Sequence, residues 1–108
     1  MGGFCQVTTS LPDRTAAERL AAQVVGERLA ACAQVAGPIH STYWWEGVVQ
    51  EAEEWYCHFK TTLAQYSRLE SRLLELHPYH VPEIIAVPIL QGNPDYLKWI
   101  QEAVRSEK

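Results

Sequence analysis

The sequence predicts an α+β fold in which an antiparallel sheet carries helices on one face. Two observations support this prediction. Short runs rich in aromatic and β-branched residues alternate with segments of helical periodicity, in the order β-α-β-β-α-β-α. The two central strand segments follow one another directly, as in an antiparallel hairpin. The length of 108 residues suits a single domain that spans residues 1–108.

The first strand and the first helix occupy the N-terminal third of the chain. FCQVTTS, residues 4–10, is a short strand by its aromatic and β-branched content. A helix is expected over residues 11–32, where Thr15 and Glu18 fit a capping box. Apolar residues recur at helical spacing through this segment and place Cys32 on its buried face. Cys32 is therefore either a small core residue or a metal ligand.

Two long strands follow, over residues 33–47 and 48–62. Gly47 lies where a hairpin turn is required. Pro38 predicts a bend or a bulge in the first of the two strands, because proline cannot donate a hydrogen bond to the ladder.

A second helix is expected over residues 61–77, with Thr62 and Gln65 as another capping box. Pro78 ends this helix, since proline disfavours the helical conformation in the residue before it.

The C-terminal part combines a strand and a helix. PEIIAVPILQ, residues 82–91, is the fourth strand, and Pro88 within it argues for a sheet edge or a bulge. The last helix is expected over residues 92–108, with Asn93 as its N-cap and Pro94 at its first position. The first six elements match the split β-α-β, or ferredoxin-like, arrangement.

The side chains of the second hairpin strand predict an oligomer. Successive residues of a strand point to opposite faces of the sheet. Two sets of bulky residues therefore face opposite ways: Trp55, Cys57 and Phe59 on one side, and Tyr56, His58 and Lys60 on the other. Helices from so short a chain cover only one face, and exposed patches of large side chains usually mark an interface. We expect a homo-oligomer.

The composition narrows the classes of partner. The chain is 47% hydrophobic and 20% charged, which is typical of a folded globular protein. Its net charge of −4 and its lack of a basic stripe argue against a nucleic-acid partner. No apolar run reaches the roughly 20 residues needed to cross a membrane. The N-terminal stretch MGGFCQVTTSLPD does not resemble a signal peptide, so we expect a cytoplasmic protein. Its three cysteines are then reduced thiols.

Several stretches together resemble the CutA family of divalent-cation tolerance proteins. They are TTSLPD, ERLAACA, STYWWEG, FKTT, HPYHVPEIIAVPI and YLKWI, in this order and almost from end to end. The resemblance implies a ferredoxin-like fold and a tight homotrimer, similar in architecture to the trimeric PII signalling proteins. It also implies a link to tolerance of divalent cations, copper above all. No enzymatic reaction belongs to the family as such, and the chain shows none of the common nucleophile, P-loop or zinc-protease motifs, so no enzyme is expected.

The candidate metal ligands follow from the preference of copper for imidazole and thiolate groups. They are His77, Cys32 and His80. Some family members carry a cysteine where this chain has Thr9, and a histidine where it has Leu76. His77 alone matches that copper pattern, and copper or another divalent cation is the only cofactor that the resemblance implies.

A second candidate site is a cleft between subunits. The site has six predicted residues: Trp45, Glu54, Lys60, His77, Tyr79 and Glu83. The stretches that resemble the family supply five of them, and Glu54 lies six positions from Lys60 on one strand, hence on the same face. An aromatic-lined cleft with a few charges is the usual form of a small-molecule site. The alternative is a network of packing and salt bridges at a subunit interface.

Three functions agree with these observations. The first is a trimeric divalent-cation tolerance protein that binds copper. The second is a PII-like trimeric sensor or binding module for a small molecule, with the cleft as its site. The third is a stable trimeric scaffold for a protein partner.

Overall fold

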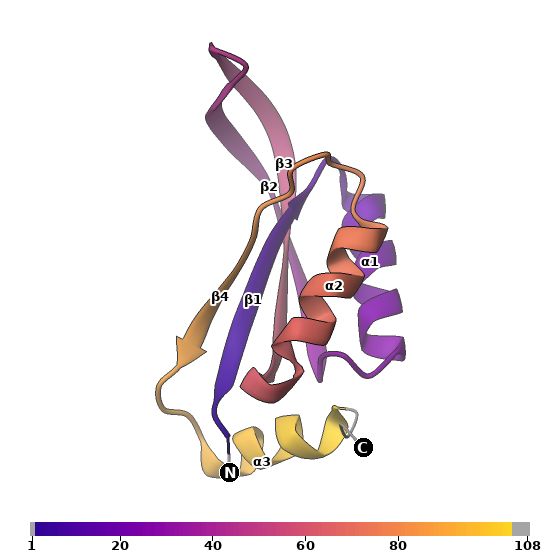
Figure 1. Ribbon diagram of the computed structural model, residues 1–108, viewed down its shortest axis with the longest axis vertical. Coiled ribbons are helices and arrows are strands. Elements are labelled where there is room, and N and C mark those ends of the chain that lie inside the picture. Colours follow the sequence, from indigo (N-terminus) through magenta and orange to yellow (C-terminus); the bar gives the residue numbers. More distant parts are fainter. Residues whose placement is uncertain (1, 105–108) are drawn as a thin grey trace.

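The computed structural model describes residues 2–104 and shows one sheet with two helices on one side and the C-terminal helix across its end (Figure 1). The strands are β1 (Phe4–Leu11), β2 (Cys32–Trp45), β3 (Val48–Thr62) and β4 (Ile84–Ile89). All neighbouring strands are antiparallel, in the spatial order β2-β3-β1-β4. The helices are α1 (Arg14–Gly26), α2 (Tyr66–Leu76) and α3 (Pro94–Ala103), with a 3-10 turn at Leu63–Gln65 before α2. The predicted class and element order are confirmed.

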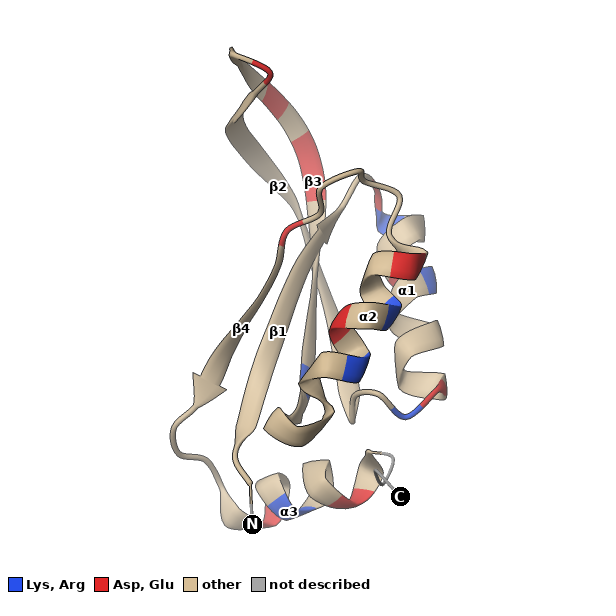
Figure 2. Ribbon diagram, in the orientation of Figure 1, with Lys and Arg blue, Asp and Glu red and all other residues tan. Residues whose placement is uncertain are grey.

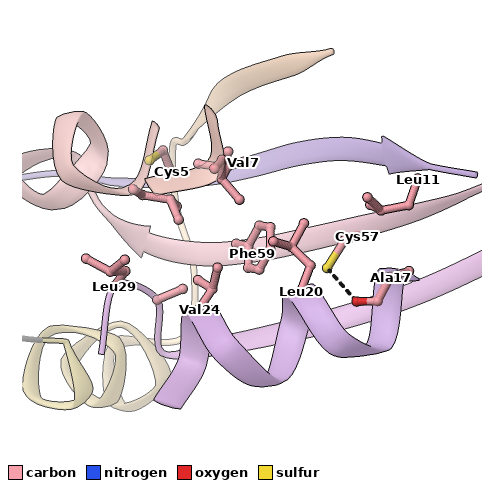
Figure 3. Close-up of a cluster of buried hydrophobic side chains, with 12 residues drawn as sticks. Cys5, Val7, Leu11, Ala17, Leu20, Val24, Leu29, Cys57 and Phe59 are labelled. Atoms are coloured by element: carbon pink, nitrogen blue, oxygen red, sulfur yellow. Dashed lines mark hydrogen bonds between the residues drawn. The ribbon is translucent and has the colours of Figure 1, made fainter. Parts of the chain in front are cut away.

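The core lies between the sheet and the helices α1 and α2 (Figure 3). Val7 of β1 pairs with Phe59 of β3, and both side chains are fully buried. Leu20 and Val24 of α1 lie against Phe59, and Cys57 lies beside Ala17. Burial raises the pKa of the Cys57 thiol to about 12, so this cysteine is an inert core residue, as its strand position predicted.

The first helix begins at a different cap from the predicted one. Asp13, not Thr15, is the N-cap, and its carboxylate accepts a 2.8 Å hydrogen bond from the backbone N–H of Ala16. Thr15 lies inside the helix, and Glu18 forms an ion pair with Arg14 instead of closing a capping box. The prediction was wrong because the sequence offers two good N-cap residues close together, and the backbone turns at the earlier one.

The first helix also ends earlier than predicted. It stops at Gly26, and Cys32 begins strand β2 rather than lying on the helix. Leu29 is still buried, but it reaches the core from the connecting segment. Arg28 has a φ of 62° and donates a 2.9 Å hydrogen bond to the carbonyl of Ala103, the last residue of α3. The spacing of apolar residues therefore does not show where the helix ends, because the loop that follows also buries apolar side chains in the core.

The β2–β3 hairpin projects beyond the rest of the sheet (Figure 1). Its turn falls at Gly47, whose φ of 81° is easy for glycine and unfavourable for other residues. The ladder shifts register between Ala36 and Ile39, on either side of a cis peptide bond at Pro38. The turn and the irregularity at Pro38 are both confirmed.

The second helix is preceded by strand and turn residues that the sequence had assigned to it. Thr62 remains in β3, and its hydroxyl accepts a 3.2 Å hydrogen bond from the Gln65 N–H. The Gln65 side chain donates to the carbonyl of Arg28, so half of the predicted capping box is present. The helix ends at Leu76, one residue before the predicted end at His77. Pro78 follows His77 and stops the helix, as predicted.

The C-terminal elements agree with the sequence in kind and differ in length. The fourth strand covers 84–89 and is an edge strand, which is where Pro88 is tolerated. Asn93 caps α3 by accepting a hydrogen bond from the Asp95 N–H. This helix ends at Ala103, and residues 105–108 of the predicted helix lie outside the described residues. No helix in the described part is long and apolar enough to span a membrane.

Neither α1 nor α2 packs on the second face of the sheet, where α3 makes contact at Cys32 through Tyr96. On this face Ile85 of β4 pairs with Thr8 and Val87 pairs with Gln6, while His58 and Lys60 of β3 pair with Thr8 and Gln6 from the other side. Ile85 and Val87 are 52% and 48% exposed. Bulky side chains therefore occupy both faces of this sheet, as the alternation along β3 predicted.

Candidate functional site

A cavity of about 890 Å³ lies where the hairpin leaves the sheet. Its walls come from the end of β1 at Ser10, from both strands of the hairpin, and from the segment 78–83 that connects α2 to β4. That segment passes beside the base of the hairpin (Figure 1). Pro78 and Pro82 restrict its backbone, because each proline fixes its own φ and limits the residue before it. The cavity is thus bounded by a sheet and a stiff loop.

Aromatic and acidic side chains dominate the lining of this cavity. The aromatic residues are Tyr43, Trp44, Trp45, Tyr56 and Tyr79. The carboxylates are Glu54 and Glu83, and the histidines are His40 and His80. His40 forms a 2.9 Å ion pair with Glu51 when its ring is protonated. An apolar wall with a few polar groups is the usual composition of a small-molecule site.

Glu54 and Tyr79 form the principal polar contact of the cavity. Glu54 is only 9% exposed, and one of its oxygens, Oε2, accepts a 2.6 Å hydrogen bond from the Tyr79 hydroxyl. Burial, this hydrogen bond and the charge of Glu54 together raise the pKa of Tyr79, so its phenol stays protonated and remains a donor. A tyrosine from the loop thereby ties segment 78–83 to strand β3.

His77 lies behind Tyr79 and supports it. Its Nδ1 accepts a 3.1 Å hydrogen bond from the Tyr79 N–H, and its ring lies 5.0 Å from the Tyr79 ring. Because Nδ1 accepts, Nε2 carries the proton of the neutral ring and donates to the Thr9 hydroxyl at 3.0 Å. Both ring nitrogens are therefore in use. Burial lowers the pKa of His77, opposed by a hydrogen bond to the Ser10 backbone and by the charge of Glu54.

This lowered pKa predicts a loss of stability in mild acid. The unfolded chain takes up a proton at His77 near the ordinary value of about 6.5, whereas the folded chain does so only at lower pH. Since the unfolded state then binds more protons, the free energy of unfolding falls as the pH drops below about 6.5. His77→Gln should show a smaller fall between pH 7 and pH 5 in urea denaturation. An unchanged pH dependence in this variant contradicts the assignment.

Four of the six predicted cleft residues line the cavity, and two do not. Trp45, Glu54, Tyr79 and Glu83 are brought together, and His77 contacts the lining from behind. Lys60 does not line it and donates a 2.6 Å hydrogen bond to Gln34 instead. Lys60 lies six positions along β3 from Glu54, a distance of about 20 Å in an extended strand.

The structure separates the three predicted metal ligands. The Sγ atom of Cys32 lies 3.6 Å from the hydroxyl of Tyr96 in α3. His80 is exposed at the rim of the cavity, and His77 contacts Thr9 and Tyr79. Within residues 2–104, no group of three or more His, Cys, Asp or Glu side chains is arranged to hold a metal ion. Sequence proximity of His77 and His80 therefore does not translate into a shared site.

The lining residues that sequence reasoning missed come mainly from the hairpin. They include Tyr43, Trp44 and Tyr56, which the sequence does not assign to the cleft, together with Ser10 at the end of β1. Their signal was the dense aromatic run at 43–45, directly before the turn. Which loop lies against this run follows only from the fold.

Comparison with known proteins identifies the family. The family model described as "CutA1 divalent ion tolerance protein" matches residues 5–103. The chain is 42% identical to the divalent-cation tolerance protein CutA of Thermus thermophilus, over 89% of this chain and 93% of that protein. It is 37% identical to the protein of the same name from Escherichia coli, over 92% and 88% of the two chains.

Solved structures show the same fold. The crystal structure of CutA1 from Oryza sativa superposes with a TM-score of 0.95 at 37% identity, over 98% of this chain and 97% of that one. The T. thermophilus structure gives a TM-score of 0.91 at 39% identity, over 94% and 99%. These matches extend over nearly the whole sequence and include the elements that build the cavity. The chain therefore belongs to the CutA1 divalent ion tolerance protein family.

Proposed function

We propose that this protein contributes to divalent-cation tolerance as a homotrimer that binds a small molecule in the cavity at the base of its hairpin. The observation that carries the proposal is the cavity itself, with five aromatic rings and the buried Glu54–Tyr79 pair. Sites of this volume and composition typically enclose organic ligands. The tolerance role comes from the names of the relatives, and no reaction is assigned to the chain.

The face of the sheet opposite α1 and α2 supports the trimer. Ile85 and Val87 expose apolar surface there, beside the half-buried His58 and Tyr56. Both outer strands, β2 and β4, also have one unpaired edge within this chain. Edges and apolar faces of this kind are normally covered by another chain. A trimer is the assembly that the family resemblance implies.

A melting-temperature screen tests the ligand proposal. The wild-type protein is heated with divalent metal salts and with organic metabolites, one at a time, because a ligand that prefers the folded state raises the melting temperature. Trp45→Leu, which removes one ring from the cavity, is screened in parallel. We expect an organic compound that stabilises the wild type and not the variant. A panel that stabilises neither protein contradicts the proposal.

Copper binding at His77 is a second candidate, favoured by one contact. Thr9 and His77 occupy two positions of the copper pattern of some family members. The Thr9 hydroxyl lies 3.0 Å from Nε2 of His77. Thr9 supplies a hydroxyl where copper prefers a thiolate. A copper titration followed by tryptophan fluorescence tests this candidate. Saturable binding that is lost in His77→Ala and strengthened in Thr9→Cys supports it, whereas binding that is indifferent to His77 rejects it.

A further inference from the structure

We propose that the cavity is built for an organic cation, namely an amine or guanidinium group carried on an apolar or aromatic body. This inference rests on the proposed function, since it names the chemical class of the ligand for the same cavity. It depends on three features of the lining: the aromatic rings, the carboxylates, and the position of the basic side chains.

The aromatic rings supply both apolar surface and an attraction for positive charge. Tyr79 is hydrogen-bonded to Glu54, and Tyr56 lies two positions along β3 from Glu54. Tyr43, Trp44 and Trp45 line the outer part of the cavity, nearer the tip of the hairpin. The face of an aromatic ring carries negative potential, so several rings around one space attract a cation, and more strongly where water is excluded. The same rings pack against the apolar part of an organic ligand.

Glu54 provides a fixed negative charge inside the cavity. Its Oε2 atom is occupied by the Tyr79 hydroxyl, while no other hydrogen bond to its carboxylate is present in the described part of the chain. The other carboxylate oxygen, Oε1, is not a buried unpaired atom, so it is accessible from the cavity and can accept hydrogen bonds from a ligand. An ammonium or guanidinium group offers the remaining hydrogen bonds together with an opposite charge. Glu83, farther along the lining, adds a second carboxylate.

Lysine and arginine side chains are absent from the lining described here, and its two histidines are His40 and His80. None of the Lys or Arg residues within 2–104 contributes to the walls. They lie on the helices, the α1–β2 connection and the opposite end of β3 (Figure 2), whereas acidic residues follow β3 up the hairpin. Glu51 and Glu53 extend the negative charge outward from Glu54. A cationic ligand is thus attracted to the entrance as well as to the site, and an anionic one is repelled.

An organic cation fits these groups better than a metal ion. A bound divalent ion requires several converging oxygen, nitrogen or sulfur ligands. The described residues contain no cluster of three such acidic, histidine or cysteine side chains. One buried carboxylate beside Tyr79, in a cavity lined by further aromatic rings, instead suits a single positive charge on an organic body.

Three probes of one size distinguish the ligand classes. Phenethylamine is a cation, phenethyl alcohol is neutral and phenylacetate is an anion at pH 7.5. Each is titrated into the wild-type protein, with tryptophan fluorescence excited at 295 nm as the readout. We expect phenethylamine to bind at least about tenfold more tightly than either of the others, a difference of about 1.4 kcal/mol. Its affinity should fall as salt is added, because salt screens the attraction.

A matched pair of variants assigns this preference to the cavity. Glu54→Gln keeps the shape of the side chain and removes its charge, so it should lose about tenfold in phenethylamine affinity. Glu102→Gln makes the same change on the exposed surface of α3 and should leave the affinity unchanged. Circular dichroism and melting of both variants check that they are folded.

Two outcomes overturn the inference. If phenethyl alcohol or phenylacetate binds as tightly as phenethylamine, or if Glu54→Gln binds phenethylamine as the wild type does, the ligand is not an organic cation. Either result leaves the proposed function standing, because the melting screen with Trp45→Leu tests small-molecule binding independently. If none of the three probes binds while the screen finds a neutral or anionic ligand, the cation class is rejected and the proposed function stands.

Discussion

Replacing Ile85 with aspartate is expected to reduce the solution mass from that of three chains to that of one, which is 12.3 kDa. Ile85 lies on the face of the sheet opposite α1 and α2, where it pairs with Thr8 and is 52% exposed in the isolated chain. In a trimer that buries this face, an unpaired carboxylate would lose its hydration without gaining a partner, at a cost of several kcal/mol at each interface. Light scattering coupled to size-exclusion chromatography measures the mass directly.

The matched control for this prediction is Leu74→Asp. Leu74 is 56% exposed, but it lies on helix α2, on the other side of the sheet. Its replacement introduces the same charge on a surface that the proposed trimer leaves in solvent, so the mass should remain that of three chains. A wild-type mass of one chain, or an Ile85→Asp variant that is still trimeric, would show that the face opposite α1 and α2 is not the interface.

Phe59→Ala is expected to lower the free energy of unfolding by about 3–5 kcal/mol. Phe59 is fully buried between the sheet and α1, where Leu20 and Val24 lie against it (Figure 3). Its removal loses the transfer free energy of the ring and leaves a space that the paired strands β1 and β3 cannot close. The change is measured by urea denaturation at a fixed chain concentration, because assembly contributes to apparent stability.

Val48→Ala serves as the comparison for Phe59→Ala. Val48 is a β-branched strand residue at the tip of the hairpin and is 56% exposed. Surface changes of this kind usually stay within about 0.5 kcal/mol. A loss below about 1 kcal/mol for Phe59→Ala, or similar losses for both variants, would contradict the placement of the core between β3 and α1.

Much of the fold could be predicted because turns, helix ends and helix caps depend on the residues at the position itself. Gly47 marks the hairpin turn through its backbone freedom, Pro78 ends α2 through steric restriction, and Asn93 caps α3 with its own side chain. The errors occur where local signals compete or continue past an element. Asp13 and Thr15 are both good caps, and the buried position of Leu29 extends the helical pattern into a loop.

Several residues of the candidate site could be predicted from the sequence, but the arrangement of the elements around it could not. Trp45, Tyr79 and Glu83 could be named from the sequence because they lie in stretches that resemble the family, and Glu54 because it shares a strand face with Lys60. Lys60 was included by its shared strand face, which does not account for the distance along the strand. The contact of Tyr79 with Glu54 joins residues 25 positions apart and depends on how the loop crosses the hairpin.

The central claim is that the cavity at the base of the hairpin is the ligand-binding site. Nitrogen-15 spectra of tryptophan-labelled protein test it most directly, because the four indole N–H groups report on different places. Trp44 and Trp45 line the cavity, whereas Trp99 lies on α3. With the compound that stabilises the protein most in the melting screen, we expect saturable shifts of the Trp44 and Trp45 signals and none of Trp99. A shift confined to Trp99, or no shift at saturation, would contradict the account.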